Sequence, residues 1–423
     1  MRARRSAALG VLAILVLGAL VPFLLAPRAE AGPEPPSLLA TAYNTQRKLV
    51  AAPDGTLFVA ITANVSGVPA ARVYSTRDGS TWTPLPPPPT SGNASDRTTL
   101  AIDSTGRLHL AWTEVVSVDR QVFYARFEGG AWVGKIQLSH SPGYAGFPSI
   151  AVDVRDRAHV AWYATDGMNY QIYYRRLEPS GWTAERALTF TTVDATNPAI
   201  ALGPDGTVHL AWARFATRGF TEIAYLRLEG DTVVETQPIS ESGVDSLAPS
   251  IVVDSAGTVH VVWDAAGRIQ YITRSTSWSQ IAPISPTTIT ARNPSLALDA
   301  GNRLHVFWEG SDRAIHAQVG NGSWSPPDVV STGGNNTYPN ARWSQFDNPL
   351  CGANGGIDVV WTEDVGGSLR LAYRRVDAPA ECPADLTVPL VVALVAIPAA
   401  IAILLFIRYR RRLRAPPERP NPP

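Results

Sequence analysis

A phrase that ends in histidine, two small or apolar residues and tryptophan occurs five times in this chain. The copies are RLHLAW from Arg107, RAHVAW from Arg157, TVHLAW from Thr207, TVHVVW from Thr258 and RLHVFW from Arg303. Their tryptophans recur about every 50 residues, a spacing typical of repeated small antiparallel sheets rather than of a helical solenoid. This repeat constrains the fold more than any other feature of the sequence.

Each copy of the phrase lies within a pattern of four predicted strands. A first strand follows a proline-containing loop, a turn rich in Asp and Gly comes next, and the His–Trp strand follows the turn. The third strand carries tyrosine, and a fourth strand often carries a second tryptophan. Apolar, β-branched and aromatic residues bounded by Gly, Asp and Pro are typical of short buried strands.

Two degenerate copies flank the clear ones. VAAPDGTLFVAI has Phe58 in the histidine position and Ile61 in the tryptophan position, whereas GIDVVW has Asp358 in the histidine position and keeps Trp361. Seven units of four strands predict an all-β fold, a seven-bladed β-propeller.

The seven units divide the predicted ectodomain, residues 37–382, into blades. The last unit ends after its third strand, so residues 37–42 are expected to fill its vacant edge and close the ring. The blades are expected near residues 47–85, 96–139, 146–189, 196–240, 247–285, 292–331 and 337–377.

Both ends of the chain carry apolar segments with basic flanks. Residues 1–31 combine N-terminal arginines, an apolar core and a small-residue cleavage site, which is typical of a signal peptide; an uncleaved anchor is the alternative. Residues 32–36 form a short linker. Residues 386–407 are apolar over a length that spans a bilayer as a helix, and the basic, Pro-rich residues 408–423 follow as a cytoplasmic tail. The sequence predicts a single-pass protein of the cell membrane with an extracellular N-terminal ectodomain.

The net charge of the whole chain hides the charge of its ectodomain. Lys plus Arg and Asp plus Glu both number 36. Removing about +3 for the N-terminal arginines and about +5 for the tail leaves roughly −8 for the exported part. This negative charge disfavours nucleic acid as a partner.

The two cysteines and the strand directions orient the predicted ring. Cys351 and Cys382 form an even pair in an exported chain, which predicts one disulfide rather than a metal or redox site. Both are expected on the face that carries the loops from first to second and from third to fourth strands. The predicted membrane helix leaves from that face, so a ligand site is expected on the opposite one.

The repeated histidines invite comparison with a metal ring. Each occupies one position in successive blades, near a blade interface and far from a common centre. We therefore expect them to pack and hydrogen-bond between blades, and we expect no metal and no cofactor. They are His109, His159, His209, His260 and His305.

The segment STRDGSTW resembles the Asp-box (BNR repeat) of the sialidase-like propeller superfamily. Ser75, Gly79, Thr81 and Trp82 fit the pattern, whereas Asp78 is displaced by one position. In that superfamily the box is a structural hairpin remote from the active site. The resemblance therefore implies a fold rather than an activity, and it indicates a non-catalytic member.

Residues at the loops of the expected ligand face are the candidate site. The resemblance implies that a catalytic sialidase would carry an arginine triad, an Arg-Ile-Pro segment and six blades, but this chain has no Arg-Ile-Pro and seven predicted blades. Two arginines precede first strands and four acids follow second strands, where carboxylate pairs would suit glycoside chemistry. The candidates, none assigned as catalytic, are Arg47, Arg97, Glu114, Asp264, Glu309 and Glu363.

These features predict an extracellular binding or adhesion module for glycans or a surface protein, because a rigid ring with variable loops suits recognition. A sialidase-like glycoside hydrolase or lyase is the first alternative. A structural component of the cell envelope is the second.

Overall fold

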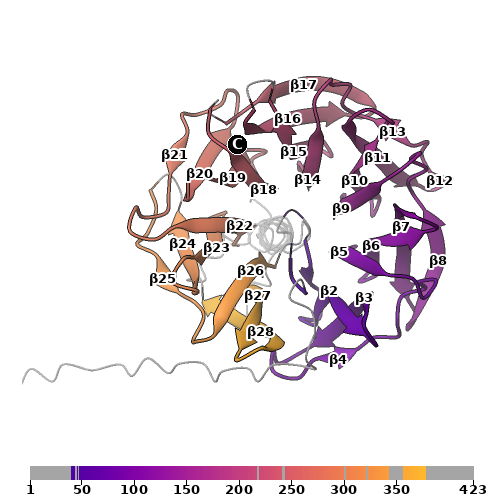
Figure 1. Cartoon of the computed structure of the whole chain (residues 1–423), viewed down its shortest axis with the longest axis horizontal. Coiled ribbons are helices and arrows are strands. Elements are labelled where there is room, and N and C mark those ends of the chain that lie inside the picture. The colour runs from indigo at the N-terminus through magenta and orange to yellow at the C-terminus, as the bar shows by residue number, and fades with distance from the viewer. Residues whose placement is uncertain are drawn as a thin grey trace, which may run out of the picture.

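A computed structural model describes residues 40–42, 45, 47–216, 219–240, 243–299, 302–320, 323–342 and 356–377. These residues form seven antiparallel sheets arranged as blades around a central axis (Figure 1). The predicted all-β seven-bladed propeller is confirmed. In Figure 1 the first strand of each blade lies nearest the axis and the last lies at the rim.

The blades follow one another along the chain, each as an antiparallel meander. Blades 1 and 2 consist of β1 (Leu49–Ala51), β2 (Leu57–Val65), β3 (Val68–Thr76) and β4 (Thr83–Pro84), then β5 (Ser95–Ile102), β6 (Leu108–Val116), β7 (Asp119–Glu128) and β8 (Ala131–Gln137). Blades 3 and 4 consist of β9 (Ala145–Val152), β10 (Ala158–Thr165), β11 (Tyr170–Glu178), β12 (Gly181–Trp182) and β13 (Arg186–Ala187), then β14 (Ala195–Leu202), β15 (Val208–Phe215), β16 (Thr221–Glu229) and β17 (Thr232–Pro238). Blades 5, 6 and 7 consist of β18 (Ser246–Val253), β19 (Val259–Ala265), β20 (Arg268–Arg274) and β21 (Ala282–Pro283), β22 (Ala291–Leu298), β23 (Leu304–Gly310), β24 (Ile315–Gly320) and β25 (Asp328–Val329), and β26 (Asn335–Ala341), β27 (Gly356–Val365) and β28 (Ser368–Asp377).

The second strand of each blade is buried on both sides because the blade packs between two neighbours. In β6 the seven residues from Leu108 to Glu114 are all buried, which explains why these strands read as near-continuous apolar runs. The repeated tryptophans are 0–4% exposed, namely Trp112, Trp162, Trp212, Trp263, Trp308 and Trp361.

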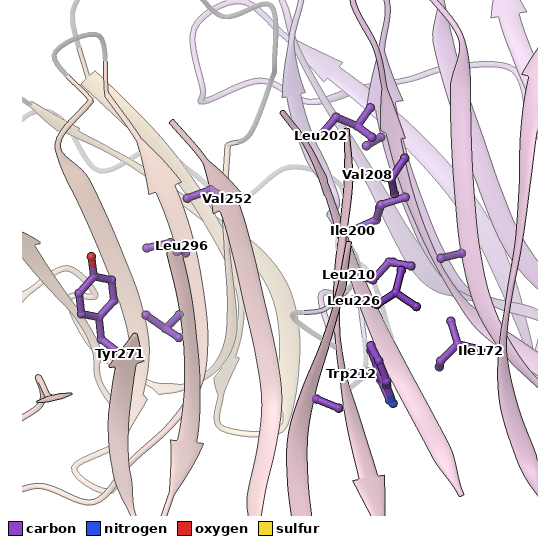
Figure 2. Close-up of a cluster of buried hydrophobic side chains, with 14 of the residues drawn as sticks. Ile172, Ile200, Leu202, Val208, Leu210, Trp212, Leu226, Val252, Tyr271 and Leu296 are labelled. Atoms are coloured by element: carbon purple, nitrogen blue, oxygen red, sulfur yellow. The ribbon is translucent and has the colours of Figure 1, made fainter. Parts of the chain in front are cut away.

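The hydrophobic core lies between blades rather than at the ring centre. Figure 2 shows Leu210 and Trp212 of β15 on the same side as Ile172 of β11, which belongs to the preceding blade. Tyrosine and tryptophan also meet edge-to-face across blade boundaries: the ring of Tyr124 lies 4.8 Å from that of Trp182. Such contacts are worth about 0.5–1.5 kcal/mol beyond area burial.

The prolines of the first strands lie within strands rather than in loops before them. In blades 2 to 7 the register between first and second strand shifts at this point, which marks a β-bulge. A bulge leaves a residue without a ladder partner, so proline is tolerated there. At each bulge one non-glycine residue has a left-handed backbone with φ of 51–55°: Arg97, Phe147, Asn197, Ala248, Asn293 and Tyr338.

The chain start closes the ring in a different way from the one predicted. The carbonyl of Ala40 accepts a hydrogen bond from Thr62 of β2 (3.2 Å), and the backbone N–H of Thr41 donates to Oγ1 of Thr362 in β27 (3.1 Å). Residues 40–42 therefore lie between the second strands of blades 1 and 7, not along the outer edge of blade 7. Within the described residues, blade 7 has three strands.

The segment from Thr45 to Lys48 occupies the centre of the ring. The carbonyl of Thr45 accepts a hydrogen bond from Ser149 of blade 3 (2.9 Å), Arg47 donates to the carbonyl of Ile251 in blade 5, and Lys48 donates to the carbonyl of Thr98 in blade 2 (2.6 Å). A single segment thus contacts the inner strands of three blades. In blade 1 it takes the place of the short bulge found in the other blades.

Several predicted features lie outside the described residues. They are the signal peptide 1–31, the helix 386–407, the tail 408–423 and the cysteines Cys351 and Cys382. Where the structure is described, it contains no helix long and apolar enough to cross a membrane.

Gly79 tests how much the contact between blades 1 and 7 contributes to stability. A methyl group on Gly79 (φ 72°) would lie 2.0 Å from Cε1 of Tyr373, whereas Gly134 (φ 67°) has no atom within 4 Å of the same position. Both alanine variants strain a left-handed backbone, by about 1 kcal/mol. We expect Gly79→Ala to lose about 1–3 kcal/mol more than Gly134→Ala in denaturant unfolding. Equal losses would show that this contact adds nothing to closure.

Candidate functional site

The two faces of the ring differ in their connections. We call the face with the loops between second and third strands and the connections between blades the hairpin face. The other, with the loops from first to second and from third to fourth strands, is the turn face. The acids after second strands lie at the hairpin face, where the sequence predicted a ligand site.

Asp264 and Glu309 are the two predicted residues that the fold brings together. The backbone N–H of Asn293 donates to Oδ2 of Asp264 (3.0 Å), and its side-chain amide donates to Oε2 of Glu309 (3.1 Å). Arg292 donates from Nε to Oε1 of Glu309 (2.7 Å), and the N–H of Tyr338 approaches Oε2 at 3.3 Å. These five residues, from blades 5, 6 and 7, form a carboxylate cluster on the hairpin face.

The cluster combines a buried acid with an exposed cation. The Arg292 side chain is 64% exposed, while that of Glu309 is 4% exposed. Burial raises the pKa of Asp264 to about 6, and the charge of Glu309 adds to this rise, while the N–H of Asn293 and the charge of Arg292 oppose it. Near neutral pH the cluster therefore offers carboxylate acceptors beside a guanidinium donor, which matches the donors and acceptors of sugar hydroxyls.

Two members of the carboxylate cluster take their place from the bulges. Asn293 and Tyr338 are the left-handed residues of blades 6 and 7, with φ of 51° and 55°. This conformation turns their N–H groups toward the acid of the preceding blade. Strained backbone of this kind concentrates at functional sites. The sequence signal was the Asn-Pro and Tyr-Pro pairs, which the sequence analysis had assigned to loops.

Glu114 and Glu363 serve their own blades. Glu114 is buried and accepts from Trp112 (2.8 Å), Lys135 (2.8 Å) and the backbone of Ser91 (2.9 Å). Burial alone would raise the pKa of Glu114, but these hydrogen bonds outweigh it and hold the pKa below its usual value. Glu363 is also buried and accepts from Arg370 (2.8 Å).

Arg97 belongs to a separate aromatic group at blades 2 and 3. Its guanidinium carbon lies 4.5 Å from the ring centre of Phe147, which stacks on Tyr163 at 5.2 Å. Arg97 also donates to Asp96 (2.6 Å), as does Arg120 (2.7 Å). The predicted match between Arg97 and Arg47 is off by one residue, because the strand pairing aligns Arg47 with Thr98.

Arg47 points into the channel rather than to the face. It is 8% exposed, and the neighbouring Lys48 is fully buried. Burial lowers the pKa of Arg47 to about 9 and that of Lys48 to about 7, the latter partly offset by Asp96. These cations hold the central segment in place, so Arg47 is not exposed on the hairpin face.

The repeated histidines hydrogen-bond within their own blades, not between blades as expected. In blade 2, Nδ1 of His109 lies 2.8 Å from the hydroxyl of Tyr124, and Nε2 lies 3.2 Å from Asp103. A neutral ring that accepts from tyrosine and donates to aspartate satisfies all three groups. The interpretation as packing residues is thus correct in kind and wrong in location. Nowhere in the described part of the chain do three or more His, Cys, Asp or Glu residues group as metal ligands.

The Asp-box segment forms a tight hairpin on the turn face. Oδ1 of Asp78 accepts from the backbone of Ser80 and Thr81 (both 2.8 Å), and these hydrogen bonds hold the pKa of Asp78 well below its usual range. Trp82 is 4% exposed and meets Tyr373 of blade 7 edge-to-face at 6.1 Å. The segment has a structural role at the junction of the first and last blades.

No family model and no curated protein matches the chain. Solved structures match at the level of the fold. An ulvan lyase, described as a new family of polysaccharide lyase, has a TM-score of 0.59 at 9% identity and covers 83% of this chain and 95% of its own. The polysaccharide lyase Uly1 has a TM-score of 0.54 at 8% identity, covering 78% and 89%. A Hadza microbial sialidase, Hz136, has a TM-score of 0.46 at 11% identity, covering 75% of each. Identities this low show the fold alone.

His209 tests the cost of charging the buried histidines. Burial lowers the pKa of His209 to about 4 in the folded protein, so as pH falls from 7 the unfolded chain takes up the proton first. Stability is therefore full above about pH 6.5 and is lost toward pH 4, by about 3 kcal/mol for this residue. We expect denaturant titrations at a series of pH values to show this loss and His209→Gln to flatten it. An unchanged pH slope in the variant would contradict the assignment.

Proposed function

We propose that this protein is a membrane-anchored, extracellular β-propeller that binds glycans through its hairpin face. The carboxylate cluster of Asp264, Arg292, Asn293, Glu309 and Tyr338 carries the proposal. A few convergent polar groups held in fixed positions are typical of sites that orient small polar ligands. On the same face, a shallow pocket of about 500 Å³ between blades 6 and 7 is lined in part by Arg313, Asn335 and Asp364.

The comparisons support a glycan as the class of ligand. Both matches above a TM-score of 0.5 described above are named polysaccharide lyases, and one structure of the ulvan lyase is bound to -[GlcA(1-4)Rha3S]-. Their propellers share the fold of this chain and carry sugar chemistry on it. The acidic cluster would favour a glycan rich in hydroxyl groups, since hydroxyls donate to carboxylates.

The proposed anchoring rests on the predicted signal peptide 1–31 and helix 386–407. The last described strand, β28, ends at Asp377, and as a third strand it runs toward the turn face. A membrane helix that starts a few residues later would leave the turn face toward the membrane. The hairpin face would then be directed away from the cell, where glycans are accessible.

Cleavage of the bound glycan is the second candidate function. A carboxyl whose pKa lies near 6, as for Asp264, beside a carboxylate paired with arginine, as for Glu309, provides an acid and a base in one site. Two carboxyl groups with separated environments are the basis of glycoside hydrolysis. The same pair could bind without reacting, so release of sugars decides between the two functions.

Glycan arrays probed with the full chain test the first proposal. We expect Arg292→Ala and Glu309→Gln each to weaken binding of the glycans identified by at least tenfold, because each removes a hydrogen bond to a charged group. Arg126→Ala is the matched control, since Arg126 pairs with Glu128 (2.7 Å) at the turn face. Binding that survives both cluster variants would place the glycan elsewhere, and absence of any bound glycan would refute the function.

Mass spectrometry of the bound glycan tests the second proposal. Cleavage would release shorter sugars at a rate that falls as pH rises through about 6, where Asp264 loses its proton. Asp264→Asn cannot supply that proton and would lower the rate about 100-fold or more. A glycan that stays intact at pH 5 and pH 7 would refute cleavage and leave binding as the function.

A further inference from the structure

Exposed apolar side chains are concentrated on the hairpin face. Fifteen large hydrophobic residues are exposed among the described ones. Four of these lie on the outer strands (Val133, Ile136, Val234 and Val329) and one, Val154, lies on the turn face. The remaining ten lie at the hairpin face. Apolar clusters of this kind on a folded surface mark interaction sites.

The largest of these side chains come from blades 3 and 4. Met168 is 90% exposed, Phe190 86%, Phe215 51% and Phe220 37%. We call these four residues the apolar patch. Figure 1 shows the strands that carry their loops, β10 and β11 in blade 3 and β15 and β16 in blade 4, as neighbours in the ring.

Hydrogen bonds hold the loops of the apolar patch side by side. The side-chain amide of Gln171 donates to Asp166, in the loop of Met168, and to the carbonyl of Thr191, next to Phe190 (3.3 and 2.7 Å).

Asp194 joins this part of the patch to the next blade. Its carboxylate accepts from the N–H of Tyr170 (2.9 Å) and its carbonyl accepts from the N–H of Phe215 (2.9 Å). Phe220 lies on the same hairpin as Phe215, since its carbonyl accepts from Ala216 (2.7 Å). The apolar patch is therefore continuous and held in a fixed shape.

Three carboxylates border the apolar patch. Asp166 accepts from the N–H of Met168 (2.9 Å), Asp194 from that of Tyr170, and Asp245 from that of Thr221 (2.8 Å). In the described ranges, none of the three forms an ion pair. Their negative charge therefore surrounds apolar side chains that have no partner in the fold.

This charge decides between the occupants that an apolar patch can take. A second copy would bring three more carboxylates against these three, and like charges across an interface are repulsive. A cytoplasmic-type lipid surface is anionic and would be repelled in the same way. A polypeptide with apolar side chains flanked by lysine or arginine satisfies both the patch and its border.

We propose that the apolar patch of blades 3 and 4 is a docking site for a basic, apolar polypeptide segment of another protein. It is separate from the carboxylate cluster, which lies on blades 5, 6 and 7. The exposed phenylalanines serve as anchors, since a few aromatic side chains carry most of the affinity at protein interfaces. The carboxylates select the charge of the partner.

Random short peptides displayed on phage, selected on the full chain, test this proposal. We expect enrichment of sequences that combine aromatic or aliphatic residues with lysine or arginine. Fluorescence anisotropy of a selected peptide should show binding weakened at least tenfold by Phe215→Ser combined with Phe220→Ser. Asp166→Asn combined with Asp245→Asn keeps the hydrogen-bond acceptors and should weaken binding and its dependence on salt.

The matched control is Val133→Ser combined with Val329→Ser, which removes apolar side chains of similar exposure (45% and 54%) from the outer strands. It should leave peptide binding unchanged. Selected peptides without basic residues, no enrichment, or equal binding to the Phe variant would each overturn the proposal. So would binding to phosphatidylcholine vesicles, or a dimer in light scattering, that the Phe variant abolishes.

Discussion

Burial of every blade on both sides is the constraint on which the rest of this structure depends. It requires the second strands to be apolar along almost their whole length, as in β6. It also requires each polar group placed there to find its partner close by, since an unsatisfied buried group costs about 1–3 kcal/mol. The chain from Tyr124 through His109 to Asp103 meets that requirement inside one blade. The repeated histidine and tryptophan are thus two results of one packing rule.

The number of blades could be predicted because burial recurs with the repeat. Trp112 and its counterparts mark the same buried position in successive blades, and even the degenerate copies at Ile61 and Trp361 keep a large apolar side chain there. The closure could not be predicted. The segment from Thr45 to Lys48 belongs to no repeat, and its partners Ser149 and Ile251 lie more than a hundred residues further along the chain.

The candidate site was predicted in part, and the reason is the alternation of side chains along a strand. Asp264 and Glu309 follow their tryptophans directly, whereas Glu114 and Glu363 follow theirs by two residues. Successive side chains point to opposite sides of a sheet, so the four acids do not share one environment. The sequence indicated the right end of the strands but not this division. Asn293, which joins Asp264 to Glu309, comes from the next blade and shows no sign of that role in its local pattern.

The central segment has a consequence for the order in which the molecule assembles. Thr45, Arg47 and Lys48 are synthesised before any blade, yet their partners Ser149, Ile251 and Thr98 lie in blades 3, 5 and 2. The earliest part of the ring to be made therefore reaches its final position only after the fifth blade exists. Contacts between residues so far apart in the chain carry a large loop-closure entropy and form slowly. During synthesis the incomplete ring has an open centre, and the insertion of two buried cations is among the last steps of folding.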